Sequence, residues 1–190
     1  MQSKTLEYQR KLAYNVYKSG KKWVKVERRI YVRRSAYIGK VELMFTGFFG
    51  QHEHNIDEKN RITFPARFRE LLGDGAFVIR GFDNNLVVMS SSRFKLLFDR
   101  VNSLSFGDAK ARDLRRFLFS NASEIEFDKN GRFIIPQNLR AYAHLDGAAT
   151  VIGSGEDIEI WAPESLKKQD EQFESPNSAA ELAEKFDLTF

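Results

Sequence analysis

A nine-residue pattern that occurs twice constrains this chain more than any other feature. The first copy runs from Asp57 to Pro65 and the second from Asp128 to Pro136, 71 residues further along. Each copy begins with Asp, reaches Arg four residues later, continues as a short apolar strand and ends at Pro. Self-similarity at a fixed spacing indicates a duplicated structural unit. The sequence therefore predicts one small β-unit present twice, with a basic loop in each copy.

The repeat extends beyond this pattern. Each Pro is followed by a short helical pattern, in which Arg69 and Arg140 occupy equivalent positions, and then by an Asp-Gly pair and two further apolar strands. Proline ends a strand and is compatible with the start of a helix, and Gly73 is placed to end the first helix. Both copies thus fit the order strand, turn, strand, helix, strand, turn, strand, helix. The predicted fold class is α+β, mainly β.

Charge divides the chain into two parts. Residues 1–43 contain twelve Lys and Arg against three Glu, a net charge of +9, whereas residues 44–190 contain eighteen basic and 23 acidic side chains, a net charge of −5. The first part has none of the 17 Phe but five of the six Tyr. The high isoelectric point therefore belongs to the first 43 residues and is not by itself an argument for nucleic-acid binding.

Three interpretations of the basic segment 1–43 remain open. It is an extension produced by a translation start assigned upstream of Met44, a basic arm that contacts phosphates, or an organelle-targeting peptide. Alternating apolar residues in 23–26 and 30–32 also indicate a short hairpin. Zero Cys removes disulfides and thiolate chemistry, and no apolar run reaches 18 residues, so the sequence predicts a cytoplasmic protein without a membrane span.

The repeated loop has both a structural and a functional interpretation. Asp57 and Asp128 can accept backbone N–H groups and stiffen a turn, and Asn60 and Gly131 are the residue types that most readily accept a positive φ. Turn geometry leaves the two arginines, four residues after each Asp, unexplained. Each Arg either pairs with its own Asp as a surface clip or projects a planar fork toward a phosphate or a guanine edge. Duplication favours the second interpretation, because two loops can meet two places on one polyanion.

Other cations lie on the same loops or on the helices that follow them. The candidate DNA-binding residues are Lys59, Arg61, Arg67, Arg69, Lys129, Arg132 and Arg140, with Asp57, Asn60, Asp128 and Gly131 as residues that shape the loops. Between the repeats, two apolar stripes at helical spacing predict antiparallel helices joined by 103–108, with the stripes in the core or an interface. Segments 166–173 and 178–186 predict a helical tail.

Several of these residues resemble the MraZ family. The resemblance rests on Met44-Phe45-Thr46-Gly47, on the doubled Asp-x-x-x-Arg loops and on Asn121-Ala122-Ser123-Glu124, and it covers nearly all of residues 44–170. It implies two tandem SpoVT-AbrB swapped-hairpin units that form a small barrel with accompanying helices. The implied boundaries are 1–43 for the basic extension, 44–97 for unit 1, 98–120 for linking helices, 121–165 for unit 2 and 166–190 for the tail.

The same resemblance implies a function. Such proteins are nucleoid-associated transcriptional regulators that bind short direct repeats in double-stranded promoter DNA, assemble as a ring, and act as repressors of the division and cell-wall gene cluster. This sequence departs from the family at Asn60, where Gly is usual, and by continuing upstream of Met44, where the family normally starts. Asn tolerates the same backbone conformation, so the turn is expected to be preserved.

Other functional classes have weaker support. His52 and His54 are spaced for one strand face, but no third ligand is placed to complete a metal site, and neither a phosphate-binding glycine loop nor a nucleophile elbow is present. The sequence therefore predicts no enzyme, no metal and no cofactor. The alternative function is that of an AbrB-like antitoxin or interaction protein that binds a partner through residues 167–190.

Overall fold

The chain divides into two compact units, residues 1–46 and 47–190. The computed structural model describes residues 23–26, 30–33, 43–45, 47–173 and 178–188. In the first unit, β1 (Trp23–Val26), β2 (Ile30–Arg33) and β3 (Leu43–Phe45) form a three-stranded antiparallel sheet in that order. Trp23 pairs with Arg33 and Val26 with Ile30, which confirms the hairpin predicted from the alternating apolar residues.

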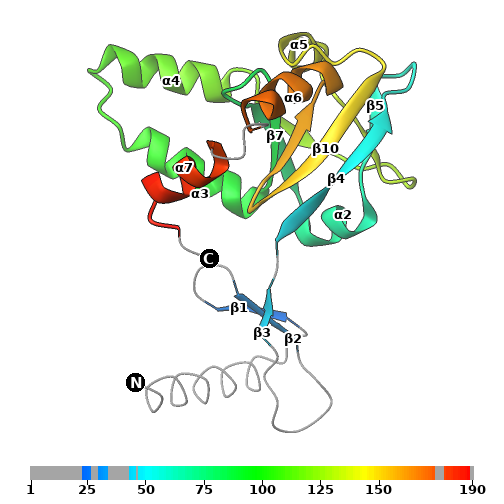
Figure 1. The fold of residues 1–190 in the computed structure, drawn as a ribbon, viewed down its shortest axis with the longest axis horizontal. Coiled ribbons are helices and arrows are strands. Elements are labelled where there is room, and N and C mark those ends of the chain that lie inside the picture. The colour runs from blue at the N-terminus through cyan, green and yellow to red at the C-terminus, as the bar shows by residue number, and fades with distance from the viewer. Residues whose placement is uncertain (1–22, 27–29, 34–42, 46, 174–177, 189–190) are drawn as a thin grey trace, which may run out of the picture. The chain divides into compact units, whose positions relative to one another are not determined.

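The second unit is built around a six-stranded antiparallel sheet in the order β4-β10-β11-β7-β6-β8 (Figure 1). A two-stranded ribbon, β5-β9, lies beside it, and a single bridge between Ile56 and Ile62 links β5 to the residue after β4. The strands are β4 (Phe48–Asn55), β5 (Arg61–Thr63), β6 (Ala76–Arg80), β7 (Leu86–Ser90), β8 (Ser123–Ile125), β9 (Arg132–Ile134), β10 (Ala148–Gly155) and β11 (Ile158–Trp161).

The two repeats are interleaved. Strands of the first repeat pair with strands of the second in four ladders, β4 with β10, β7 with β11, β6 with β8, and β5 with β9. By the repeat, β4 corresponds to β8, β6 to β10 and β7 to β11, so the sheet order is symmetric about the β11–β7 pair. This arrangement confirms the predicted mixed, sheet-rich fold with swapped hairpins, although no ladder between described residues closes the sheet into a full barrel.

Apolar residues at equivalent positions of the two repeats meet in one core. Ile62 and Phe64 of the first repeat are at most 1% exposed, as are Ile135 and Leu139 of the second, and Phe133 is 2% exposed. The rings of Phe64 and Phe133 pack edge to face with centroids 5.4 Å apart. Because each repeat supplies half of this core, neither could bury its apolar face alone.

Two short helices flank the ribbon at equivalent places, α2 (Ala66–Leu72) after β5 and α5 (Gln137–Tyr142) after β9. Pro65 and Pro136 stand immediately before them, and Gly73 ends α2 with a φ of 73°. Proline is suited to this place because its fixed φ ends the strand and its missing N–H is not needed at a helix start. The two prolines therefore end β5 and β9 in the same way and begin equivalent helices.

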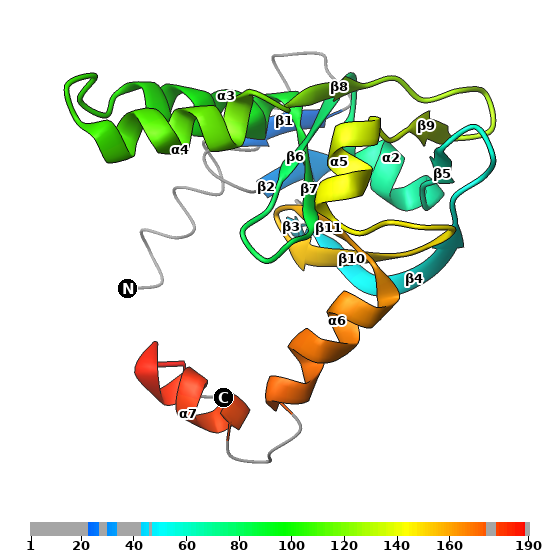
Figure 2. The same ribbon diagram turned by 90° about the horizontal axis from the view of Figure 1, so that it is seen from above.

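The predicted antiparallel helices are α3 (Ser91–Asn102) and α4 (Ala109–Phe119). Most of the residues in their apolar stripes pack with Ile79 and Met89 in a second core cluster, which confirms the core interpretation for those residues. Phe98 and Leu104 of the first stripe are 47% and 40% exposed, so the interface interpretation stays a prediction for them. Figures 1 and 2 place this helical hairpin at the opposite end of the unit from the β5-β9 ribbon.

The chain continues through α6 (Pro163–Asp170), a 3-10 turn (Glu171–Phe173) and α7 (Ser178–Lys185). Among the described residues, no helix combines the length and apolar character that a membrane crossing requires.

Candidate nucleic-acid interface

Each Asp-x-x-x-Arg loop is a tight turn organised by its Asp. Asp57 Oδ1 accepts the backbone N–H of Lys59 at 3.0 Å and of Arg61 at 2.9 Å, and the Asp128 carboxylate makes the same two bonds in the second loop. The fourth position has a positive φ in both loops, 61° at Asn60 and 72° at Gly131. The residue types chosen there are those that adopt this conformation at the lowest cost.

The two loops meet in a cluster of four charges. Arg61 donates through Nε to Asp57 Oδ2 at 2.8 Å and Arg132 donates to Asp128 Oδ2 at 2.9 Å, so the surface clip weighed from the sequence is present in both copies. Each guanidinium also approaches the carboxylate of the other repeat, since Nη1 of Arg61 lies 3.7 Å from Asp128 and Nη1 of Arg132 lies 3.7 Å from Asp57. We call these four residues the Asp–Arg quartet. Its formal charge is zero.

The contacts within the quartet shift the pKa values of Asp57, Asp128 and Arg61. Hydrogen bonds from the Arg61 side chain and backbone lower the pKa of Asp57 to about 2. The pKa of Asp128 is lowered for the same reasons, with the backbone N–H of Arg132 contributing most, and the bond to Asp57 raises the pKa of Arg61. Both carboxylates are therefore charged at neutral pH. The Arg side chains remain 24% and 27% exposed, so neither fork is fully buried.

Arg69 and Arg140 contact the turn of the opposite repeat. Arg69 donates through Nε to the Phe64 carbonyl at 3.3 Å, and its guanidinium lies so close to Gly131 that a Cβ there would come within 2.5 Å of it. Arg140 donates to Asn60 Oδ1. Both arginines are half-buried and engaged with protein groups. Each helix thus supports the loop of the repeat to which it does not belong.

The remaining candidate cations are exposed. Lys59, Arg67 and Lys129 all lie at the surface on or beside the loops. Lys59 is the third residue of its loop, whereas Lys129 is the second, where the first loop carries Glu58. The two loops are therefore equivalent in backbone and in their quartet residues but differ in charge at the tip.

The β5-β9 ribbon carries a mixed outer face. In the antiparallel register Arg61 lies opposite Ile134, Ile62 opposite Phe133, and Thr63 opposite Arg132. Since side chains alternate along a strand, the Ile62–Phe133 pair faces the core and the other two pairs share the outer face. Thr63 is exposed and Ile134 is 62% exposed. The loops and ribbon together form one edge that presents two guanidinium groups, a hydroxyl and an isoleucine.

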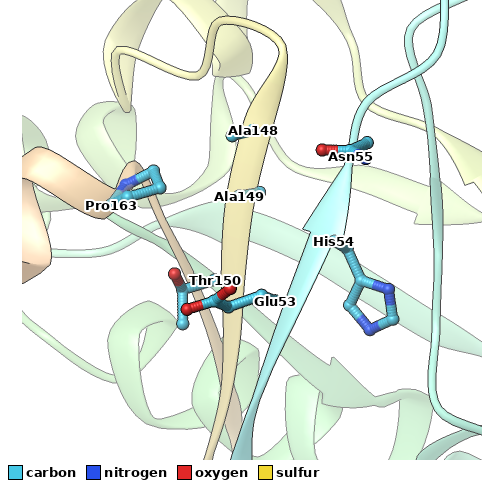
Figure 3. Close-up of a pocket in the computed structure, with 7 residues that line it drawn as sticks. All are labelled: Glu53, His54, Asn55, Ala148, Ala149, Thr150 and Pro163. Carbon is cyan, nitrogen blue, oxygen red and sulfur yellow. The ribbon is translucent and has the colours of Figure 1, made fainter.

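A shallow pocket between β4, β10 and the start of α6 lies elsewhere. Its lining residues are Glu53, His54, Asn55, Ala148, Ala149, Thr150 and Pro163. Figure 3 shows the His54 ring directed away from Glu53 and Thr150, so these side chains do not converge. Burial and the nearby His52 lower the pKa of His54. In the part of the chain that the structure describes, no three His, Cys, Asp or Glu side chains are grouped as a metal site.

Comparison with known proteins finds the same duplication. The family model described as "MraZ protein, putative antitoxin-like" matches residues 47–117 and again residues 118–189. The chain belongs to the MraZ family. It is 44% identical over 137 residues to the "Transcriptional regulator MraZ" of Desulforamulus reducens, which covers 72% of this chain and 95% of that protein. The protein of the same name from Thermomicrobium roseum is 41% identical over 138 residues, which are 72% of this chain and 97% of that protein. The one from Roseiflexus sp. is 44% identical over 116 residues, which are 61% of this chain and 81% of that protein.

Membership of the MraZ family confirms the resemblance seen in the sequence, and the structure shows how its loops are arranged. The sequence predicted both loops, but it contained no sign that Arg69 and Arg140 reach the opposite repeat. It also left Thr63 and Ile134 unnoticed. Strand alternation was the available signal, because both residues are two positions beyond a loop Arg and must share its face.

Proposed function

We propose that this MraZ-family protein is a DNA-binding transcriptional regulator whose DNA-contacting surface is the edge formed by the two Asp-x-x-x-Arg loops and the β5-β9 ribbon. It acts in the cytoplasm on the nucleoid, without an enzymatic reaction, as a repressor of the division and cell-wall gene cluster. The names of its relatives as transcriptional regulators support the general function. The observation that carries the assignment of the surface is the meeting of both loops at one edge.

The Asp–Arg quartet supports a role in base recognition more than in phosphate neutralisation. Its formal charge is zero, so it adds little to attraction for the DNA backbone. Each carboxylate holds the Nε and Nη2 side of its own fork, while Nη1 approaches only the other repeat's carboxylate among the described residues, at 3.7 Å. A fork held in this way loses little conformational freedom on binding. The guanine O6 and N7 acceptors in the major groove are suitable partners.

In this proposal the exposed cations make the phosphate contacts. Lys59 and Lys129 on the loop tips and Arg67 at the start of α2 are placed beside the quartet and are exposed. Arg69 and Arg140, also candidates from the sequence, are assigned to supporting the turns, because each is engaged with the opposite loop. Asp57, Asn60, Asp128 and Gly131 shape the loops. This division separates the residues that read DNA from those that fix the geometry.

Self-assembly as a ring on short direct repeats is part of the proposal. At the described loop edge one chain offers three exposed cations, Lys59, Arg67 and Lys129, and each neutralised phosphate contributes modestly to affinity, with strong dependence on salt. Several chains that engage consecutive repeats convert later contacts into intramolecular ones and raise the effective concentration. The charge available at a single loop edge therefore favours a multivalent arrangement.

The test is binding of the full chain to a duplex from the region upstream of its own gene, measured by fluorescence anisotropy. Arg61→Ala and Arg132→Ala are each expected to weaken binding roughly 5- to 150-fold, the range for loss of one bidentate base contact. Arg61→Lys keeps the charge but removes the planar fork, so it should recover little of the affinity. Light scattering establishes that each variant keeps the wild-type assembly mass.

Arg116→Ala is the matched control. Arg116 is exposed on α4, pairs with Asp113 three residues earlier, and lies at the opposite end of the unit from the ribbon. Its removal should leave affinity unchanged. Wild-type affinity in Arg61→Ala, Arg132→Ala and the double variant would reject the proposed surface.

The antitoxin-like alternative rests on the end of the chain. Leu182, Phe186 and Leu188 are 40%, 66% and 57% exposed, so α7 and the residues after it present apolar side chains. The matching family is also described as antitoxin-like. A chain truncated after residue 173 tests this alternative. If the segment binds a partner, the truncated chain should lose its activity in cells. If the loop edge binds DNA, the truncated chain should keep the operator affinity of each edge.

A further inference from the structure

The outer face of the ribbon breaks the symmetry of the two repeats at one pair of positions. Thr63 and Ile134 are equivalent in the repeat, because each lies two residues after the loop Arg. Both are exposed, and each is opposite the other repeat's loop Arg in the ladder. Each half of the face therefore has a guanidinium, but beside it one half offers the short, partly polar side chain of Thr63 and the other the larger, wholly apolar side chain of Ile134.

The dimensions of the ribbon suit the major groove. That groove is about 12 Å wide and admits a two-stranded antiparallel ribbon. Side chains opposite each other on one face have Cβ atoms about 5 Å apart, and successive bases on a strand are about 3.4 Å apart along the helix axis. A guanidinium of Arg61 that reaches a base edge therefore places Ile134 over a base pair one or two steps away. In the major groove the apolar group that such a side chain can meet is the C5-methyl of thymine.

We propose that Ile134 is a specificity-determining residue that contacts a thymine methyl group, next to the base read by Arg61, and that Thr63 does not impose the same requirement on the other half-site. This inference rests on the proposed function and deepens it. The edge is built from two nearly equivalent halves, one from each repeat, so the difference between Ile134 and Thr63 makes it recognise two unequal half-sites. The protein then binds a given operator in only one orientation. A directional contact is compatible with operators that repeat head to tail, since successive copies of the edge then meet identical surroundings.

The experiment removes the methyl group from DNA and the side chain from the protein. A duplex is selected from random sequence by the full chain, and each thymine is then replaced singly by deoxyuridine, which lacks only the C5-methyl group. Wild-type protein should bind about three- to fivefold more weakly at one or two substituted positions, the effect of one methyl group removed from an apolar contact. Ile134→Ala should bind the parent duplex more weakly and lose the sensitivity to deoxyuridine at those positions.

Leu96→Ala is the matched control, because Leu96 is also an exposed aliphatic residue, 59% exposed, on α3 at the other end of the unit. It should keep the full sensitivity to deoxyuridine. Thr63→Ala should keep it as well at the positions assigned to Ile134. Light scattering on Ile134→Ala should give the wild-type assembly mass.

The outcomes separate the inference from the proposed function. The methyl contact is overturned if the affinity of the wild-type protein is unchanged by every deoxyuridine substitution. It is also overturned if the substitutions weaken binding equally in wild type and Ile134→Ala. Neither result contradicts the proposed DNA-binding surface. Dissociation of the assembly by Ile134→Ala also overturns it, because the side chain then covers a second copy of the chain. Failure to select any duplex rejects the proposed function and this inference together.

Discussion

Replacing Gly131 by Ala tests how the two repeats support each other. Gly131 is buried, has a φ of 72°, and lies under the guanidinium of Arg69 from the other repeat. A Cβ built there would be 2.5 Å from Arg69 Cζ, 2.6 Å from Nε and 2.8 Å from Nη2. The substitution therefore introduces backbone strain and displaces the guanidinium together.

The expected destabilisation combines three terms. A left-handed conformation costs an L-residue about 1–2 kcal/mol. Displacing Arg69 from the Phe64 carbonyl, now 3.3 Å from its Nε, loses a bond worth about 0.5–1.5 kcal/mol. The smaller entropy of the unfolded chain returns about 0.4–1 kcal/mol. The net loss is about 1–2 kcal/mol, which for a chain of this size lowers Tm by roughly 3–6 °C.

Urea unfolding and thermal unfolding of the full chain at fixed concentration measure the change. Gly107→Ala is the control, because Gly107 lies in the exposed α3–α4 connection and its added Cβ would meet only Ser105 Oγ at 3.7 Å. Its stability should stay within about 0.5 kcal/mol of wild type. In the double variant with Arg69→Ala the steric contribution of Gly131→Ala disappears, so the two substitutions should cost less together than their separate costs added.

The reasoning fails if Gly131→Ala is no less stable than Gly107→Ala. Additive costs of Gly131→Ala and Arg69→Ala would refute the cross-repeat contact specifically, while leaving the backbone strain intact.

Three further predictions concern the charges and the hydroxyl group of one half-buried tyrosine. The pKa of Asp57 is about 2, below its ordinary 3.8. Its contribution to stability is therefore complete above about pH 4 and lost as the pH falls toward 2, so Asp57→Asn should flatten the acid limb of a plot of Tm against pH. Lys129→Gln should reduce the slope of log affinity against log salt by about one, whereas Lys110→Gln on the distant α4 should not. Tyr142→Phe removes the 2.7 Å bond from the Tyr142 hydroxyl to the Gly81 carbonyl and should cost about 1 kcal/mol in urea unfolding.

Local chemistry made the repeat and its loops predictable. Asp at the first loop position, Asn or Gly at the fourth and Pro after the strand each have a backbone reason, so the turns and the starts of α2 and α5 follow from the residues. The helical hairpin followed from apolar spacing in the same way. Charge composition did not help to predict the loops as the binding surface, because the excess of Lys and Arg belongs to residues 1–43.

The partners of the arginines were harder to predict. The pairing of Arg61 with Asp57 was one of two interpretations that the sequence offered, whereas Arg69 and Arg140 appeared only as possible phosphate ligands and in fact reach the opposite turn. A contact between Arg140 and Asn60, 80 residues apart, depends on which strands pair. Sequence spacing does not contain that information.

The sequence by itself determined that two equivalent units exist, that each has a stiff basic turn, and where each turn and helix begins, since these depend on neighbours within a few residues. Only the tertiary structure decided that β5 pairs with β9, which brings four charges from two distant loops into one quartet and places Thr63 and Ile134 on the same face as the arginines. The physical reason is that neither repeat can cover its apolar face alone. Burial of Ile62, Phe64, Phe133 and Ile135 in one shared core selects the interleaved pairing, and that pairing assembles the edge.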